Sequence, residues 1–379
     1  MTELTISSVF DSGAIEVLSV ADPQDIQLKI RADNAAEFAQ WFHFCLHGAA
    51  GQAVTLRFMN VSQCAYPKGW EDYQVVASHD RQNWFRVDTQ FDGAVMTVRT
   101  TPPTQAMYFA YFEPYSYEQH LDLLGSASAS AYVQLERLGS SLDGRDMSVL
   151  HITDDASITP LAEKKQVWLI ARQHPGETMA EWFMEGCLER LLDVDDSVSR
   201  ALLERCVFHV VPNMNPDGAA RGNLRTNAAG ANLNREWAEP SMERSPEVFL
   251  VRQKMRAIGV DLCLDAHGDE GLPYNFVVGS EGTTGYSERV AGLENAFKSV
   301  WAACCPDFQD AHNYGVQAPG AANMTLATNW VAQEFGCLAL TIEMPFKDNA
   351  NLPDAQVGWS GARSKKFGAS VLQPLLAVL

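Results

Sequence analysis

The hydrophobic and polar positions follow different patterns in the two parts of the chain. From Leu4 to about Phe112, short apolar runs recur with polar or Gly/Pro breaks between them, as in an all-β domain. Two runs, WFHFCL (residues 41–46) and VTLRFM (54–59), partly alternate apolar with polar side chains, as half-buried antiparallel strands do. The further runs are IQLKI (26–30), YQVVAS (73–78), WFRV (84–87), AVMTVRT (94–100) and MYFAYF (107–112). The pattern predicts an N-terminal antiparallel β-sandwich domain over residues 1–114.

From Val133 onward, strongly apolar strands alternate with helical segments. The strands are predicted at VWLIA (167–171), VFHVV (207–211), LCLDA (262–266) and CLALTI (337–342). Met179, Phe183, Cys187 and Leu191 recur every four residues, which places them on one face of a helix. Such alternation predicts an α/β/α domain over residues 115–379, with a mixed, mostly parallel sheet. The segment EPYSYEQHLDLL (113–124) is the expected junction.

Length, composition and charge narrow the function classes. A chain of 379 residues exceeds the usual size of a single core, which favours two domains. The formal net charge of −19 argues against a nucleic-acid partner, because phosphate would be repelled. The N-terminus carries no basic segment followed by an apolar stretch, and no run of apolar residues is long enough to span a membrane. We therefore expect a cytoplasmic protein with no membrane partner; the oligomeric state has no signal in the sequence.

Three residues have the chemistry and placement of metal ligands. His174-Pro-Gly-Glu177 offers an imidazole and a carboxylate between a strand and a helix, and His267 follows another apolar strand in LDAHGD. A catalytic zinc usually takes three protein ligands and keeps one position for water. The alternative is that HPGE is a simple turn, because H-x-x-E alone is frequent by chance. Placement just beyond a buried strand distinguishes this pair of histidines from the others in the chain.

Glu343, in ALTIEMPF, is the candidate general base. A carboxylate at the end of an apolar strand is costly to bury unless a partner or a function retains it. Beside a metal it could take a proton from water and pass it to a leaving amine. The alternative is a carboxylate that pairs with a neighbouring arginine.

A segment between the first and last ligands is suited to binding a carboxylate. VVPNMNPDGAARGNLRTNAAGANLNREW (210–237) is rich in Asn, Arg and Gly, and it contains Arg225, Asn234 and Arg235. Guanidinium groups and amides grip a carboxylate through two oxygens. An enzyme that reads a free C-terminus needs such a clamp to hold the scissile bond in place. A solvated loop with ordinary surface arginines is the alternative.

Taken in order, these motifs resemble those of the zinc metallocarboxypeptidases of the carboxypeptidase A type. HPGE is similar to the first metal motif, NMNPDG to a turn, GANLNREW to the G-x-[DN]-x-N-R segment, DAHGD to the second histidine motif and TIEMPF to the catalytic glutamate strand. LGSSLDGRDMSVLHI (138–152) resembles the hairpin that opens the catalytic domain. A preceding β-rich domain and the junction YFEPYSYEQHLDLL are similar to the cytosolic carboxypeptidase branch.

The resemblance assigns a role to each candidate. It implies one Zn²⁺ on His174, Glu177 and His267, with Glu343 as general acid/base. It implies Arg225, Asn234 and Arg235 on the substrate carboxylate and the developing oxyanion.

Three positions depart from the family pattern or are not fixed by it. Asn232 stands where many relatives have an aspartate that binds a ligating histidine. Tyr314 is the candidate for the tyrosine that covers the substrate's terminal residue. The stretch MTLATNWVAQEF (324–335) has no Arg or Lys, whereas relatives that remove glutamate keep a basic residue there.

We predict a zinc metallocarboxypeptidase that removes C-terminal residues, with side-chain-linked or acidic residues among the candidates, from peptides or protein tails. Two alternatives stay open. A related zinc hydrolase could deacylate small N-acyl amino acids with the same ligand arrangement. A non-catalytic module could bind zinc or acidic tails, although the presence of Glu343 argues against it.

Overall fold

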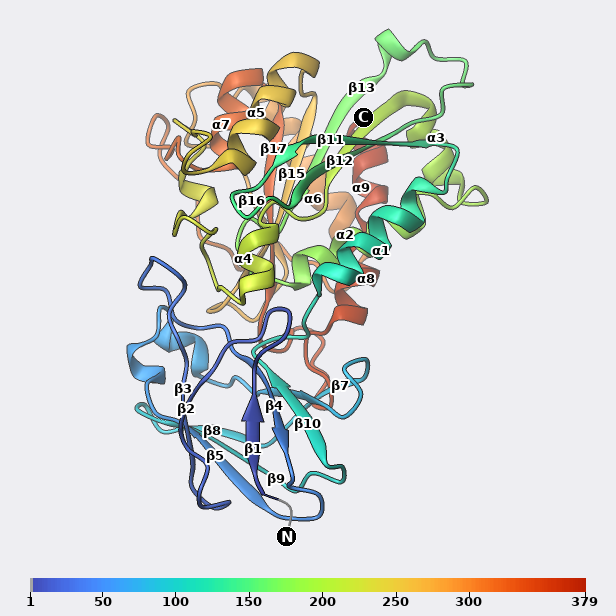
Figure 1. Ribbon diagram of the computed structural model, residues 1–379. Helices are drawn as coiled ribbons and strands as arrows, with labels where there is room; N and C mark the ends of the chain where they lie inside the picture. The colour runs from blue at the N-terminus through green and yellow to red at the C-terminus, as the bar shows by residue number, and fades with distance from the viewer. Residues whose placement is uncertain (1–2) are drawn as a thin grey trace.

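The computed structural model describes residues 3–379, and Figure 1 shows two lobes, an N-terminal one of strands and a larger one of strands and helices. Two five-stranded sheets build the first lobe, in the orders β1-β4-β10-β6-β7 and β2-β3-β5-β9-β8. Their strands are β1 (Thr5–Ser7), β2 (Glu16–Ser19), β3 (Ile26–Lys29), β4 (His43–His47), β5 (Val54–Phe58), β6 (Val76–Ser78), β7 (Trp84–Arg86), β8 (Thr89–Phe91), β9 (Met96–Thr100) and β10 (Ala106–Ala110).

The predicted N-terminal sheets are confirmed, with one departure in pairing. β3 and β5 run parallel, whereas the other neighbouring strands in both sheets are antiparallel. Three short strands, β1, β2 and β8, were not predicted. Their side chains are mostly exposed or half-buried, so no apolar run marks them. We propose the domain boundary at residue 114, since β10 ends at Ala110 and α1 begins at Tyr117.

The second lobe contains the predicted mixed sheet, of seven strands in the order β11-β12-β14-β13-β15-β17-β16. The four central strands, β14, β13, β15 and β17, are parallel, and the others pair antiparallel. The strands are β11 (Val133–Ser140), β12 (Asp146–Ile152), β13 (Lys165–Ala171), β14 (Cys206–Val211), β15 (Leu262–Asp269), β16 (Phe276–Val278) and β17 (Leu338–Pro345). β11 and β12 form the expected opening hairpin.

Helices cover both faces of this sheet. They are α1 (Tyr117–Ser128), α2 (Met179–Leu191), α3 (Ser197–Arg205), α4 (Pro216–Arg221), α5 (Pro246–Ile258), α6 (Glu288–Cys304), α7 (Ala327–Phe335), α8 (Gly361–Ser370) and α9 (Leu372–Val378), with short 3₁₀ turns η1 (Val61–Gln63), η2 (Pro67–Trp70), η3 (Leu161–Glu163) and η4 (Leu233–Arg235). Within the described residues, no helix combines the length and the apolar character that a membrane crossing requires.

The period of two along each strand explains why the central strands are apolar throughout. On β13, Val167 and Leu169 pack into the core shared with α2 and the N-terminal lobe, whereas Trp168 and Ile170 pack into a second core with α5 and α7. Since both faces are buried, the strand reads as a continuous apolar run.

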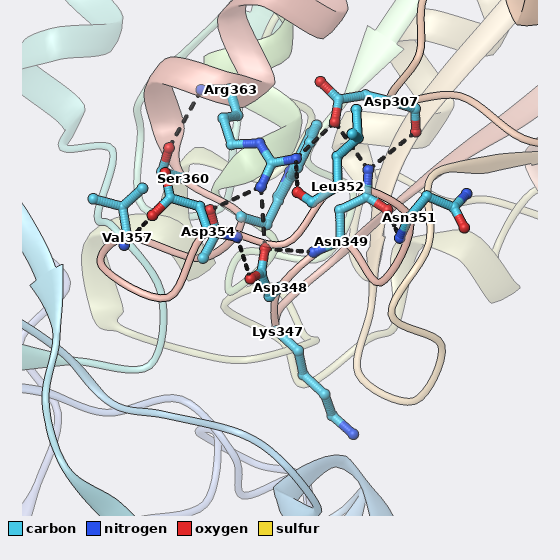
Figure 2. Close-up of polar contacts among 12 residues, drawn as sticks. Asp307, Lys347, Asp348, Asn349, Asn351, Leu352, Asp354, Val357, Ser360 and Arg363 are labelled. Atoms are coloured by element: carbon cyan, nitrogen blue, oxygen red, sulfur yellow. Dashed lines mark hydrogen bonds and ion pairs between the residues drawn. The ribbon is translucent and has the colours of Figure 1, made fainter.

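The connection after β17 is fixed from two sides. Figure 2 shows Arg363 of α8, whose guanidinium donates to Asp307 at 2.7 Å and to Asp348 at 3.1 Å and also binds the carbonyl of Leu352. From the N-terminal lobe, Arg86 donates to the carbonyls of Phe346 at 2.9 Å and Trp359 at 3.0 Å. These contacts tie the segment that follows Glu343 to both lobes.

Candidate active site

The loop between β13 and α2 presents His174 and Glu177. Gly176 lies so close to a neighbouring segment that an added Cβ would be 3.1 Å from the Cα atom and the carbonyl oxygen of Leu224. Its N–H donates to that same carbonyl at 2.8 Å. The glycine of HPGE therefore allows a close approach that a larger residue would widen, and it joins the loop to the segment that carries Arg225.

His267 and Glu343 lie on adjacent strands and face each other in register. His267 of β15 pairs with Glu343 of β17, and the ladder continues to Asp269 and Pro345. The sequence predicted both residues just beyond their strands, but both lie inside them, because the parallel pairing extends three residues past each predicted strand end. The register itself brings the two side chains to one end of the sheet.

His174, Glu177 and His267 come together as predicted. Of the residues that the structure describes, they form the one group whose ligand atoms, all within 4.8 Å of one another, could hold a metal ion. Glu177 lies between the imidazoles, 2.7 Å from Nδ1 of His174 and 2.8 Å from Nδ1 of His267, and the two Nδ1 atoms are 3.2 Å apart. All three residues are buried.

The outer nitrogens of the two imidazoles face acceptors. Nε2 of His174 is 3.0 Å from Oδ1 of Asn232, and Nε2 of His267 is 2.9 Å from Oδ2 of Asp265. With the proton held on each Nε2, both Nδ1 lone pairs point toward Glu177 and the shared centre. Two imidazole nitrogens and a carboxylate that converge on one point fit a divalent cation, and this ligand set is typical of catalytic zinc.

Electrostatics in the metal-free protein agree with a cation-binding centre. Burial and the charge of Arg225 lower the pKa of His174 to about 4, so its ring is neutral. Burial opposes a charge on His267, but Asp265 and Glu177 raise its pKa well above the ordinary value. Burial also opposes ionisation of Glu177, but the two imidazoles hold its pKa below the ordinary value. In the metal-free protein, a proton on His267 thus balances the negative charge of Asp265 and Glu177, and a bound metal ion would displace that proton.

Glu343 is buried beside this centre, and Oε2 of its carboxylate has no hydrogen-bond partner. Burial raises its pKa well above the ordinary value; His267 opposes the shift, and Glu177 and Asp269 add to it. Among the described residues, no Arg or Lys forms a salt bridge with Glu343, so the alternative of an arginine ion pair is wrong. A carboxylate held without a partner beside a metal site is suited to moving a proton.

The three predicted carboxylate-binding residues differ in their contacts and in their distance from the metal ligands. Arg225 reaches Glu177, with Nη1 3.6 Å from Oε1. Asn234 accepts from the backbone N–H of Ala327 at 2.8 Å, and its Nδ2 lies 3.4 Å from Nε2, the outer nitrogen of His267. Arg235 donates to the carbonyl of Asn234 at 2.6 Å, and its side chain is exposed.

One cavity of 370 Å³ contains all seven predicted site residues. Tyr314 also lines it, and its hydroxyl binds Asp269. Tyr66 of the N-terminal lobe forms part of the wall, with its ring centroid 5.3 Å from Cζ of Arg225. Arg225 and Arg235 supply the positive charge among the described lining residues.

Several residues of the site were not predicted. Asp265 had a signal, since it lies two residues before His267 and therefore on the same face of β15. Glu270, buried in the cavity with Oε1 unpartnered, directly follows DAHGD; burial raises its pKa to about 8, and Arg225 opposes the shift. Tyr66 belongs to the other domain, and no local pattern connects it to the metal motif.

A buried His, Glu, His set beside a free carboxylate and two arginines, at one end of a mixed sheet, defines a metal-dependent hydrolase site. The comparisons give the family. Residues 117–359 match the model of the zinc carboxypeptidase family, and residues 6–112 match that of the cytosolic carboxypeptidase N-terminal domain. The chain belongs to the zinc carboxypeptidases, a family of zinc-dependent peptidases.

Relatives and solved structures agree with this assignment. A metallo-carboxypeptidase from Burkholderia cenocepacia is 50% identical with a TM-score of 0.95, and the match covers 98% of each chain. One from Pseudomonas aeruginosa, solved with (2-guanidinoethylmercapto)succinic acid, is 48% identical with a TM-score of 0.94 and the same coverage. Human cytosolic carboxypeptidase 1 is 28% identical over 288 residues, which make up 65% of this chain and 23% of the human protein.

Proposed function

We propose that this protein is a zinc carboxypeptidase that removes C-terminal residues from peptides or protein tails, with Zn²⁺ held by His174, Glu177 and His267. The observation that carries the proposal is the single cavity in which the three ligands, Glu343 and the arginines lie together. A metal site alone would fit many hydrolases. Its combination with a cationic wall favours a substrate that ends in a carboxylate.

Glu343 is the group proposed to move the proton. Bound zinc would polarise the scissile carbonyl and lower the pKa of water. The unpartnered Oε2 of Glu343 can accept a proton from the attacking water and return it to the leaving amine. Burial raises the pKa of Glu343 well above the ordinary value, which strengthens it as the base that takes the proton.

Arg225, Asn234 and Arg235 are proposed to hold the substrate's carboxylate and the developing oxyanion. Of these three residues, Asn234 and Arg225 lie nearest the proposed metal ligands, with Nδ2 of Asn234 3.4 Å from His267 and Nη1 of Arg225 3.6 Å from Glu177. Arg235 is further out, bound to the carbonyl of Asn234. Such a clamp converts binding energy into orientation of the scissile bond.

The terminal side chain is expected to be neutral rather than acidic. The lining cations, Arg225 and Arg235, are both assigned to the carboxylate, and the acidic lining residues Asp269 and Glu270 offer no positive charge to an acidic side chain. The described residues of segment 324–335 contribute no Arg or Lys to it. Tyr314, proposed to cover the terminal residue, also lines the cavity.

The test compares matched peptides with zinc-loaded protein. A peptide with a free C-terminus should lose one residue, and its C-terminally amidated twin should stay intact. Glu343→Gln, which keeps shape but removes the base, should lower kcat about 10²- to 10⁴-fold while zinc stays bound. Equal cleavage of both twins would refute the exopeptidase assignment. Turnover of N-acyl amino acids without release from peptides would favour the deacylase alternative.

A further inference from the structure

The N-terminal domain contacts the backbone that carries Arg225 through one buried carboxylate. Asp33 lies beyond the end of β3, and its two oxygens accept four hydrogen bonds from three consecutive residues. Oδ1 accepts from the N–H of Leu224 at 2.6 Å. Oδ2 accepts from the N–H of Arg225 at 2.8 Å and from the N–H and hydroxyl of Thr226, both at 2.9 Å.

This arrangement depends on a carboxylate. Three successive backbone N–H groups that converge on one side chain have no place in a helix or strand ladder, so Asp33 takes the place of their missing partners. Hydrogen bonds to a charged acceptor are the stronger kind, and a buried N–H left unpaired is costly. An amide in the same position would lose the charge and place an NH₂ group against these donors.

The same segment is bound to the metal-ligand loop on its other side. The carbonyl of Leu224 accepts from the N–H of Gly176, the glycine of HPGE. Residues 224–226 are therefore fixed between Asp33 and the loop that presents His174 and Glu177. A shift of this backbone would change the position of the Arg225 guanidinium relative to the metal centre.

The side chain of Arg225 meets the N-terminal domain as well. Its guanidinium lies over the ring of Tyr66, with Cζ 5.3 Å from the centroid. Buried Gln40 fixes Tyr66, since it accepts from the backbone N–H of Tyr66 and donates to the carbonyl, each at 3.2 Å. Both ends of Arg225 are thus placed by residues outside the catalytic domain.

We propose that Asp33 is a positioning residue for catalysis: it holds the backbone of residues 224–226 and thereby sets the guanidinium of Arg225 in the cavity. This inference rests on the proposed function of Arg225. It predicts that the N-terminal domain contributes to the rate of hydrolysis and not to folding alone.

A double-mutant cycle on the full-length, zinc-loaded protein tests the proposal. Asp33→Asn should lower kcat/KM for a free-ended peptide about 10- to 100-fold, because a misplacement of about 1 Å at a positioning group has effects of this size. On an Arg225→Ala background, the same substitution should change kcat/KM by no more than about twofold. Zinc content should stay the same, since Asp33 touches none of the ligands.

Arg31→Gln is the matched control. Arg31 also crosses the domain interface, where it binds the carbonyls of Arg221 and Gly222, but it does not touch residues 224–226. Its removal should leave kcat/KM within about twofold of the wild-type value. If Asp33→Asn does not fold, Thr226→Val, which removes one of the four hydrogen bonds, should lower kcat/KM about two- to tenfold and show the same dependence on Arg225.

The outcomes separate this proposal from the proposed function. An equal loss with and without Arg225, or no loss, would refute the positioning role and leave the carboxypeptidase assignment intact. Full activity of Arg225→Ala would refute the role of Arg225 and, with it, that of Asp33. Hydrogen exchange gives a readout without catalysis: the amides of residues 224–226 should exchange faster in Asp33→Asn than in Arg31→Gln. Unchanged exchange would also overturn the proposal.

Discussion

Removal of the carboxylate behind His267 should weaken zinc binding in graded steps. Oδ2 of Asp265 accepts from Nε2 of His267 at 2.9 Å and from Nε2 of Gln173 at 2.6 Å, whereas Oδ1 has no partner. Asp265→Asn can keep the shared acceptor but loses the charge and buries an unpaired NH₂. Asp265→Ala loses the acceptor altogether and frees the imidazole to rotate.

The magnitude follows from these contacts. Loss of a hydrogen-bonded partner behind a ligand typically costs about 10- to 100-fold in metal affinity. We expect about tenfold for Asp265→Asn, because the ring stays oriented, and about 100-fold for Asp265→Ala. Converted at about 1.4 kcal/mol for each factor of ten, these are about 1.4 and 2.8 kcal/mol.

Competition with a chromophoric chelator measures the zinc Kd directly. The reciprocal control is Asn232→Asp, which adds a charge 3.0 Å from Nε2 of His174 and should tighten binding. If Asp265→Ala binds zinc within about twofold of the wild-type protein, the argument that the outer acceptors fix the imidazoles is wrong. The reasoning would also be refuted if all three variants changed the zinc affinity in the same direction and by the same factor.

Three further predictions concern stability. Zinc at a hundredfold excess over its Kd should stabilise the fold by about 2.7 kcal/mol, visible as a rise in Tm that His174→Ala abolishes; an unchanged Tm would contradict a ligand role. Burial raises the pKa of Glu113 to about 7 in the folded protein. Its contribution to folding stability is therefore greatest at pH values below its pKa in the unfolded chain, and it is lost as pH rises through 7. Glu113→Gln should therefore reduce the fall in Tm between pH 5 and 8, and an identical fall would refute this. Gly186→Ala should cost about 1–3 kcal/mol, because its Cβ would meet Lys365 O at 1.9 Å, whereas Gly125→Ala in open helix should stabilise by about 0.5–1 kcal/mol; urea unfolding separates them.

The sequence predicted the parts of this protein that follow from local patterning. Apolar runs gave the central strands, because β13 is buried on both faces and has no polar position to interrupt it. Glycine and proline marked the turn at His174. Strands with exposed side chains, such as β2, carry no such pattern and were missed.

The residues of the candidate metal centre could be brought together from sequence for a related reason. His174, Glu177, His267 and Glu343 lie at the same end of parallel strands, so chain order alone brings them near one another. Asp265 shares a face with His267 by the same period of two. The strand ends could not be placed exactly by sequence, since continued pairing depends on the neighbouring strand rather than on the residues themselves.

Contacts between the domains had no comparable signal, and they determine how the site is completed. Asp33 and the N–H of Arg225 are separated by 192 residues, and nothing in the sequence around either one indicates the other. The cavity also places the carboxylate of Asp269 near the proposed carboxylate clamp, where its charge would repel an anionic substrate end. To bind the substrate's carboxylate as proposed, the guanidinium of Arg225 has to outweigh that repulsion, and this requires it to be held in place. Because Asp33 and Tyr66 contact Arg225 from the N-terminal domain, the proposed role of Arg225 makes that domain part of how the cavity would select a carboxylate.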